Sequence, residues 1–178
     1  MPAALGNRVL AASRLLLASV LLCLALGGCA AHAPPARAQG VAEGTALDPA
    51  PFRPLARWVA LRFGMDELPL PAVVASRQML ESTDRRMNLA RSGERMRALY
   101  TPGIIVLSPE TWDPRDPLEL SFVVHELVHH AQIMSGRHAP CPEALEEEAY
   151  ILQNAWLEEQ GRPPLYDPHW ITDRARCR

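Results

Sequence analysis

The sequence contains 178 residues, 48% of them hydrophobic, and all 18 of its basic residues are arginine. The 20 acidic residues give a formal net charge of −2 at pH 7, a balance that does not suggest a nucleic-acid-binding protein. This length accommodates one folded domain behind a leader, but not two domains.

Residues 1–28 have the features of a bacterial export signal. Two arginines precede an apolar run from Leu15 to Leu26, which is too short for a comfortable transmembrane helix. The residues that follow, up to Cys29, resemble a lipobox, in which the cysteine is acylated and becomes the new N-terminus. We therefore expect a lipoprotein signal peptide over 1–28 and lipidation of Cys29. Cleavage after Ala38 by the ordinary signal peptidase is the alternative.

Such a signal predicts an exported, periplasmic protein with a lipid anchor in a bacterial membrane. Ala30 and Ala31 carry no obvious retention signal for the inner membrane, which favours the outer membrane. Residues 29–51 are rich in Ala, Pro and Gly, and this composition cannot bury a core. The sequence predicts a flexible tether over 29–51 and a folded domain over 52–178.

The first part of this domain contains a predicted helix and short extended segments. Residues 52–63 carry apolar side chains at helical spacing, which predicts an amphipathic helix. Residues 68–74 are apolar, and their prolines suit an edge strand or the approach to one. Two apolar runs, 96–100 and 104–108, flank Thr-Pro-Gly and predict a β-hairpin.

A buried helix is predicted after the hairpin. Asp116 suits the N-cap, Pro117 suits the first helical position, and Glu119 lies at the spacing that closes a capping box. Gly136 is a stop signal, and the residues between are apolar on nearly every face. A helix of this composition is buried, so each polar residue within it needs a physical reason.

Three of those polar residues form the pattern His-Glu-x-x-His. His125 and His129 lie one turn apart on one face of the helix, where two imidazoles can bind one metal ion. Glu126 lies about 100° further round the helix, so it suits a general base acting on water better than a third ligand. The alternative is a core helix whose histidines bind carbonyls or water, but an unpaired buried carboxylate beside them is then costly.

A catalytic zinc site usually has three protein ligands, so one more is expected from the next helix. That helix is predicted from Glu143 to near Gly161. At 100° per residue, Glu146 and Glu148 flank its buried apolar stripe, while Glu147 faces away from it. The residues therefore predict that Glu146 or Glu148 completes the site.

Over residues 96–157 the chain resembles the gluzincins, zincin-type metallopeptidases with His-Glu-x-x-His on one helix and a glutamate ligand on a later one. The resemblance is carried by His125 to His129 and by Glu146-Glu147-Glu148-Ala149, which fits the Glu-x-x-Ala pattern of several such families and favours Glu146. The thermolysin-like pattern, with Ala directly after the ligand, would select Glu148. The resemblance implies an α+β fold, namely a small zincin-like, minigluzincin-type domain with a short antiparallel sheet or hairpin packed on the metal-binding helix and a following glutamate helix.

The expected activity is zinc-dependent peptide-bond hydrolysis in the bacterial cell envelope. Zn²⁺ is expected on His125, His129 and Glu146, with water activated by the metal and Glu126. The expected substrate is a peptide or protein of the envelope, paired with a strand of the hairpin. Candidate donors to the oxyanion are Tyr100, His130, Tyr150, Tyr166 and His169. The alternatives are a non-catalytic zinc-binding lipoprotein that serves as an envelope assembly factor or scaffold, and a regulated protease with one envelope substrate.

The four cysteines agree with export. Cys23 lies within the predicted signal and Cys29 is the predicted lipidation site, so the domain retains Cys141 and Cys177. In an oxidising periplasm these two thiols are expected to form a disulfide between the C-terminal tail and the start of the glutamate helix. Metal ligation by both cysteines is the competing interpretation.

Overall fold

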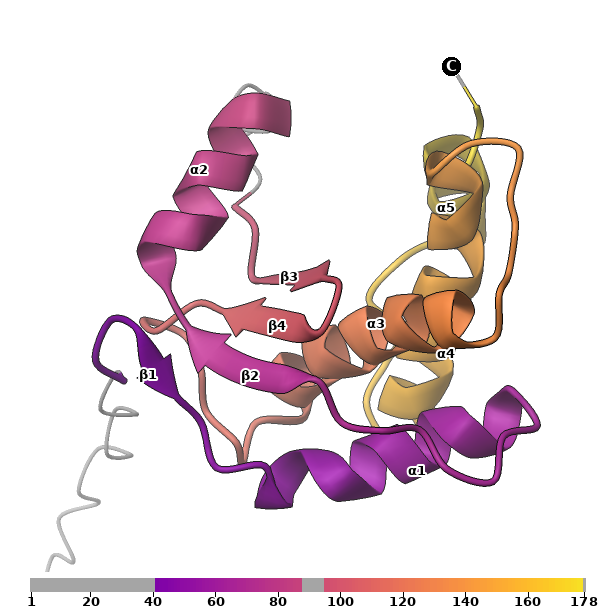
Figure 1. Cartoon of the computed structure of the whole chain (residues 1–178). Helices are drawn as coiled ribbons and strands as arrows, with labels where there is room; N and C mark the ends of the chain where they lie inside the picture. The colour runs from indigo at the N-terminus through magenta and orange to yellow at the C-terminus, as the bar shows by residue number, and fades with distance from the viewer. Residues whose placement is uncertain (1–40, 88–94, 178) are drawn as a thin grey trace, which may run out of the picture. The chain divides into compact units, whose positions relative to one another are not determined.

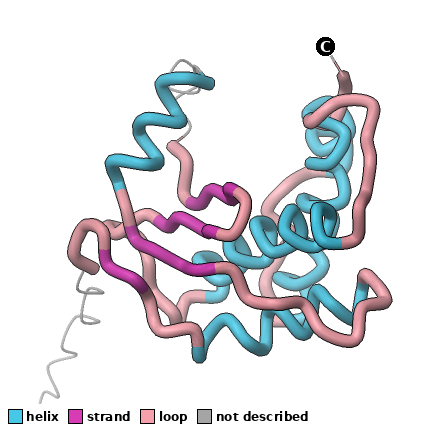
Figure 2. The backbone as a smooth tube through the Cα atoms, viewed as in Figure 1, coloured by secondary structure: helices cyan, strands magenta, loops and turns pink. Residues whose placement is uncertain are grey.

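The computed structural model describes residues 41–87 and 95–177. Its centre is a four-stranded sheet with a long helix packed against it (Figure 1). Within these residues five α-helices and the sheet form a mixed fold, which confirms the predicted α+β class. The elements in chain order are β1 (Thr45–Ala46), the 3-10 turn η1 (Ala50–Phe52), α1 (Arg53–Arg62), β2 (Ala72–Ala75), α2 (Arg77–Met87), β3 (Ala98–Thr101), β4 (Ile104–Leu107), α3 (Pro117–Met134), α4 (Glu143–Glu159) and α5 (Pro168–Arg174). Figure 2 shows the strands side by side and the helices outside the sheet.

The predicted hairpin is formed by β3 and β4. These strands pair antiparallel with Tyr100 opposite Ile105, and Gly103 in the turn has a φ of 86°, which glycine adopts without side-chain strain. The whole sheet is mixed, not antiparallel as expected, because β2 runs parallel to β4 with Val73 opposite Ile105. Parallel strands need a crossover connection, and α2 lies within it. The strand order β1-β2-β4-β3 places β3 at an edge of the described sheet.

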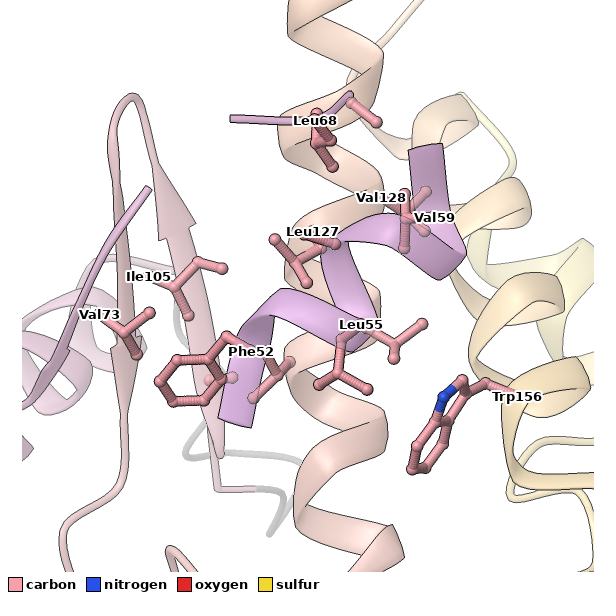
Figure 3. Packing of buried hydrophobic residues seen from close by; sticks show 14 of the residues in the cluster. Phe52, Leu55, Val59, Leu68, Val73, Ile105, Leu127, Val128 and Trp156 are labelled. Carbon is pink, nitrogen blue, oxygen red and sulfur yellow. The ribbon is translucent and has the colours of Figure 1, made fainter. Parts of the chain in front are cut away.

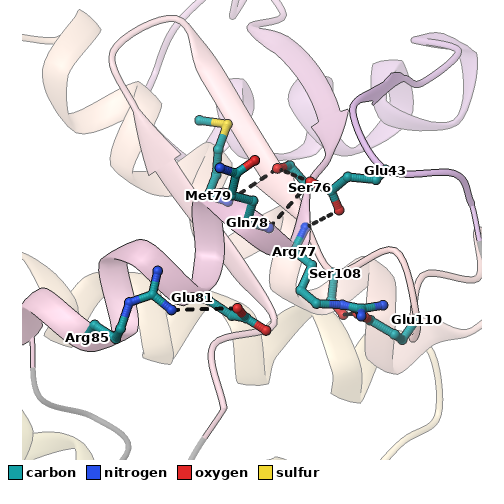
Figure 4. A network of polar contacts seen from close by, with 9 residues as sticks. All are labelled: Glu43, Ser76, Arg77, Gln78, Met79, Glu81, Arg85, Ser108 and Glu110. Carbon is teal, nitrogen blue, oxygen red and sulfur yellow. Dashed lines mark hydrogen bonds and ion pairs between the residues drawn. The ribbon is translucent and has the colours of Figure 1, made fainter.

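The fold includes residues 41–51, which their composition places in the tether. β1 pairs antiparallel with β2, and Glu43 caps the start of α2 by accepting hydrogen bonds from the Ser76 hydroxyl (2.6 Å) and the Arg77 backbone N–H (2.8 Å) (Figure 4). These bonds, that of Ser76 first, hold the pKa of Glu43 below its ordinary value. The folded part therefore begins before residue 52, held by strand pairing and a side-chain cap that composition does not reveal.

α3 runs through the centre of the hydrophobic core. The sheet, α1 and α4 all contact it, and Figure 3 shows side chains from these elements packed together. The α3 residues without measurable exposure include Val123, Val124, Leu127, Val128 and Ala131. Burial of each larger apolar side chain contributes about 1.5–3 kcal/mol, so α3 is a rigid platform for its polar residues.

The two ends of α3 follow the sequence signals with one correction. The Asp116 side chain accepts a hydrogen bond from the Leu118 N–H (2.9 Å), and the helix ends at Met134, two residues before Gly136, whose φ is 66°. Glu119 does not close the expected capping box. It is 5% exposed and forms an ion pair with Arg97, because a cation from a segment distant in sequence lies close enough to bind it.

Residues 1–40 lie outside the described residues, and with them the predicted signal peptide and Cys29. Within the described ranges, no helix is both long enough and apolar enough to cross a membrane. The expected lipid anchor is therefore a proposal that rests on the sequence.

Candidate metal centre

α4 packs along α3 and brings Glu146 to the two histidines of the motif. The His125 Nε2 and His129 Nε2 atoms are 3.1 Å apart, and the Glu146 carboxylate oxygens lie 3.2 Å and 3.4 Å from them. Three ligands about 2.0–2.1 Å from one tetrahedral ion lie about 3.3–3.4 Å apart. The two glutamate distances involve different oxygens of the carboxylate, and one ligand atom from each of the three residues lies within 4.8 Å of the others, so this group could hold a metal ion.

The structure shows which glutamate of α4 lies with the histidines, a question that helical angles alone do not decide. Glu146 joins the histidines, whereas Glu148 accepts hydrogen bonds from Arg137 (2.9 Å) and from the Gln132 carboxamide (3.1 Å). Glu147 is exposed, as expected from its position opposite the buried stripe. The alternative ligand Glu148 therefore does not belong to the group that could bind a metal.

A buried glutamine, which the sequence reasoning missed, fixes the orientation of His129. Gln132 is 1% exposed, and its Nε2 donates to the Leu145 carbonyl (2.9 Å) and to Glu148, both of which only accept. Its Oε1 therefore faces His129 Nδ1 at 2.9 Å and accepts the Nδ1 proton. With a proton held on Nδ1, His129 can offer the lone pair of Nε2 to a metal ion when one is bound. The available signal was a glutamine in an otherwise apolar helix.

His129 and Glu146 are coupled electrostatically. Burial is the largest influence on His129 and lowers its pKa, but the hydrogen bond and charge of Glu146, together with the charge of Glu126, raise that pKa to about 9. Burial raises the pKa of Glu146, and the hydrogen bonds and charges of His125 and His129 outweigh it and hold that pKa well below its ordinary value. Without a metal, His129 and Glu146 therefore form a largely buried ion pair within the group of candidate ligands.

Glu126, the expected general base, lies close enough to this group to interact with all three of its members. Its side chain is 8% exposed. Burial is the largest influence and raises the pKa of Glu126 above its ordinary value, against the opposing charges of His125 and His129. The charge of Glu146 raises it further, and a backbone hydrogen bond from Tyr100 lowers it. A raised carboxyl pKa suits a group that accepts a proton and returns it near neutral pH.

Two of the five candidate oxyanion donors satisfy each other. His130 Nε2 lies 2.8 Å from the Pro69 carbonyl, which only accepts, so Nε2 carries the proton. In the neutral ring, Nδ1 then accepts from the Tyr100 hydroxyl at 3.0 Å. These groups fasten α3 to β3 and to the segment before β2. A third candidate, His169, is exposed on α5.

The other two candidates belong to an aromatic cluster beside the candidate metal centre. The ring of Tyr150 lies 4.6 Å from that of His125, 4.6 Å from that of Tyr166 and 5.0 Å from that of Trp170, measured between centroids. Asn154 holds the loop in place by bonding both the N–H and the carbonyl of Tyr166. Burial raises the pKa of Tyr150, so its hydroxyl stays protonated and able to donate. Tyr150 is therefore the candidate donor with a direct contact to a proposed ligand.

A family model identifies the domain. The model of DUF6647, a domain of unknown function, matches residues 49–178. The chain belongs to this family. The match spans the whole candidate metal centre and both cysteines of the fold. Comparison with curated proteins and with solved structures found no match for the chain.

The DUF6647 domain carries the predicted disulfide. Cys141 and Cys177 are bonded, with their Cα atoms 5.7 Å apart, which confirms the pairing and excludes these two thiols as metal ligands in this structure. The bond joins the segment before α4 to the segment after α5. The helix that was absent from the sequence predictions, α5, is thereby fastened to the glutamate helix.

Proposed function

We propose that this DUF6647 domain is a zinc-dependent metallopeptidase of the gluzincin type. His125, His129 and Glu146 are the proposed ligands, and Glu126 is the proposed general base. The observation that carries the proposal is the set of separations between 3.1 and 3.4 Å among the three ligand groups, with the buried carboxylate of Glu126 next to them. A structural zinc site is usually closed by four protein ligands, whereas three ligands leave one position for water or substrate.

The edge strand β3 supports a peptide substrate and the zincin-like part of the proposal. In this hairpin Arg97 and Ser108 form a hydrogen-bonded pair, so by alternation the backbone groups of Ala98 and Tyr100 point away from β4. These groups lie on the edge that faces Glu126, as the backbone hydrogen bond from Tyr100 indicates. An extended peptide that pairs with this edge places its backbone beside the proposed general base.

The proposed reaction is the addition of one water across a peptide bond. A zinc ion at this centre supplies Lewis acidity, which makes a water more acidic and polarises a carbonyl. Glu126 takes a proton from the attacking water and passes it to the nitrogen of the leaving amine as the carbon–nitrogen bond breaks. Gln132 keeps His129 in the tautomer that ligation requires, and Tyr150, whose ring contacts that of His125, is the proposed donor to the developing oxyanion.

The proposed location is the periplasmic side of a bacterial membrane, with a lipid on Cys29 and an envelope peptide or protein as substrate. The lipobox-like sequence up to Cys29 supports the anchor. The disulfide between Cys141 and Cys177 supports an oxidising compartment, where such bonds persist. The outer membrane remains the favoured site.

The proposal is tested with Glu126→Gln in the full chain, assayed on a mixed library of fluorogenic peptides. Glu126→Gln should retain one zinc per chain and lose about 10²–10⁴-fold in turnover, the usual contribution of a positioned acid–base group. Glu147→Gln, an exposed neighbour of the site, is the control and should match the wild type. Equal turnover by Glu126→Gln would contradict the mechanism. A wild type that binds zinc but cleaves no peptide would favour the scaffold alternative.

A further inference from the structure

The two histidines of the centre differ in what their second ring nitrogen contacts. His129 Nδ1 bonds Gln132 Oε1 at 2.9 Å. His125 Nδ1 is buried, and among the described residues it has no hydrogen-bond partner. A histidine that binds a metal through Nε2 carries a proton on Nδ1, and proteins almost always give that proton an acceptor. The His125 Nδ1 proton therefore needs an acceptor close to the ring.

A second fully buried glutamine, Gln153, has an acceptor atom that lacks a donor among the described residues. Gln153 on α4 has no measurable exposure, and its Nε2 donates to Ser121 Oγ at 3.0 Å. Ser121 Oγ itself donates to the Leu118 carbonyl at 2.7 Å, so it accepts from the glutamine, and this fixes which end of the amide faces it. The other end, Gln153 Oε1, is a buried acceptor without a partner among the described residues.

Helical spacing brings the side chains that carry these two atoms to the same part of the interface between α3 and α4. Ser121, which binds Gln153, lies one turn before His125 and therefore on the same face of α3. Tyr150, whose ring packs on His125, lies one turn before Gln153 on α4. A buried donor and a buried acceptor left unpaired are both unfavourable, and one water between them satisfies both.

We propose that Gln153 is a positioning residue for His125, and that it acts through one buried water that accepts the His125 Nδ1 proton and donates to Gln153 Oε1. The proposal rests on the proposed metal centre. It gives each histidine a glutamine acceptor, Gln132 directly and Gln153 through water. In both cases Nδ1 keeps its proton and the lone pair of Nε2 is directed to the metal.

The test compares zinc dissociation constants of full-length variants by competition with a chromogenic chelator. Gln153→Leu removes the acceptor and should weaken zinc binding about 10–100-fold, the usual effect of losing such a partner. Ser121→Ala is the matched control, because it breaks the same interhelical hydrogen bond but retains Gln153 Oε1, and its affinity should change by less than about threefold. Gln153→Glu retains an acceptor oxygen at this position and should bind zinc within about threefold of the wild type.

A second readout begins with the wild type, and that part does not depend on how well a variant folds. Long-range ¹H–¹⁵N NMR of the zinc-loaded wild type should show a proton on His125 Nδ1 that exchanges slowly with solvent, and Gln153→Leu should exchange it faster. Equal affinities of Gln153→Leu and wild type, equal losses in Gln153→Leu and Ser121→Ala, or an unprotonated Nδ1 in the wild type would overturn the inference. A wild type that binds no zinc would overturn the proposed function itself, so the two failures are distinguishable.

Discussion

Removal of the disulfide should cost the fold about 4 kcal/mol. Cys141 and Cys177 are 36 positions apart, and loop-closure entropy for a loop of that length gives about 3.8 kcal/mol at 25 °C. α5 has 7 residues, fewer than an isolated helix needs to be stable, so it depends on its attachments to α4. The double substitution Cys141→Ser with Cys177→Ser therefore removes both a constraint on the unfolded chain and one of the attachments of α5.

The assay is urea unfolding of the full chain followed by tryptophan fluorescence, because Trp170 on α5 and Trp156 on α4 report on this region. Wild type with its disulfide reduced is the control and should unfold at the same urea concentration as the double variant. A free energy of unfolding within about 1 kcal/mol of the wild type would refute the reasoning, because a constraint of this loop length should contribute several times that amount.

Three further predictions concern polar groups around α3. Arg97→Met should lower the free energy of unfolding by about 3 kcal/mol, because the buried Glu119 carboxylate loses its cation; a urea midpoint equal to the wild type would contradict this. Tyr100→Phe should cost about 1 kcal/mol of stability and leave zinc affinity unchanged, because its hydroxyl bonds His130 and not a ligand; weaker zinc binding by titration would show otherwise. The His129 pKa of about 9 lies above its ordinary value, so in metal-free protein kept in chelator its contribution to stability should be full below pH 6.5 and be lost as pH rises through 9. Zinc affinity should rise over the same pH range, because zinc displaces that proton. Urea midpoints and zinc titrations across pH 6–9.5 check the two signs.

The sequence predicts the motif helix well because its signals are local. His125, Glu126 and His129 are fixed relative to one another by helical geometry, and a cap and a glycine mark the ends of that helix. The hairpin is equally local, since Gly103 lies between two apolar runs. The disulfide also follows from counting, because Cys141 and Cys177 remain once Cys23 is assigned to the predicted signal and Cys29 to lipidation.

What the sequence cannot predict depends on partners far along the chain. Glu146 and Glu148 both flank the buried stripe of α4, so helical position does not show which of them is the third ligand. Arg137 and Gln132, which lie outside α4, bind Glu148 and leave Glu146 to join the histidines. The capping box fails because Arg97 binds its glutamate. Buried glutamines give no periodic signal, so the two that bear on the histidines emerge only from the packing of α3 against α4.

Metal content of the purified full chain tests the central claim most directly. Elemental analysis of the wild type should give one zinc per chain. His129→Ala and Glu146→Ala should each lose it, while Glu148→Ala should retain it, because Glu148 bonds Arg137 and lies outside the ligand group. Absence of stoichiometric metal in the wild type, or loss of zinc in Glu148→Ala but not in Glu146→Ala, would contradict the metal centre described for this domain.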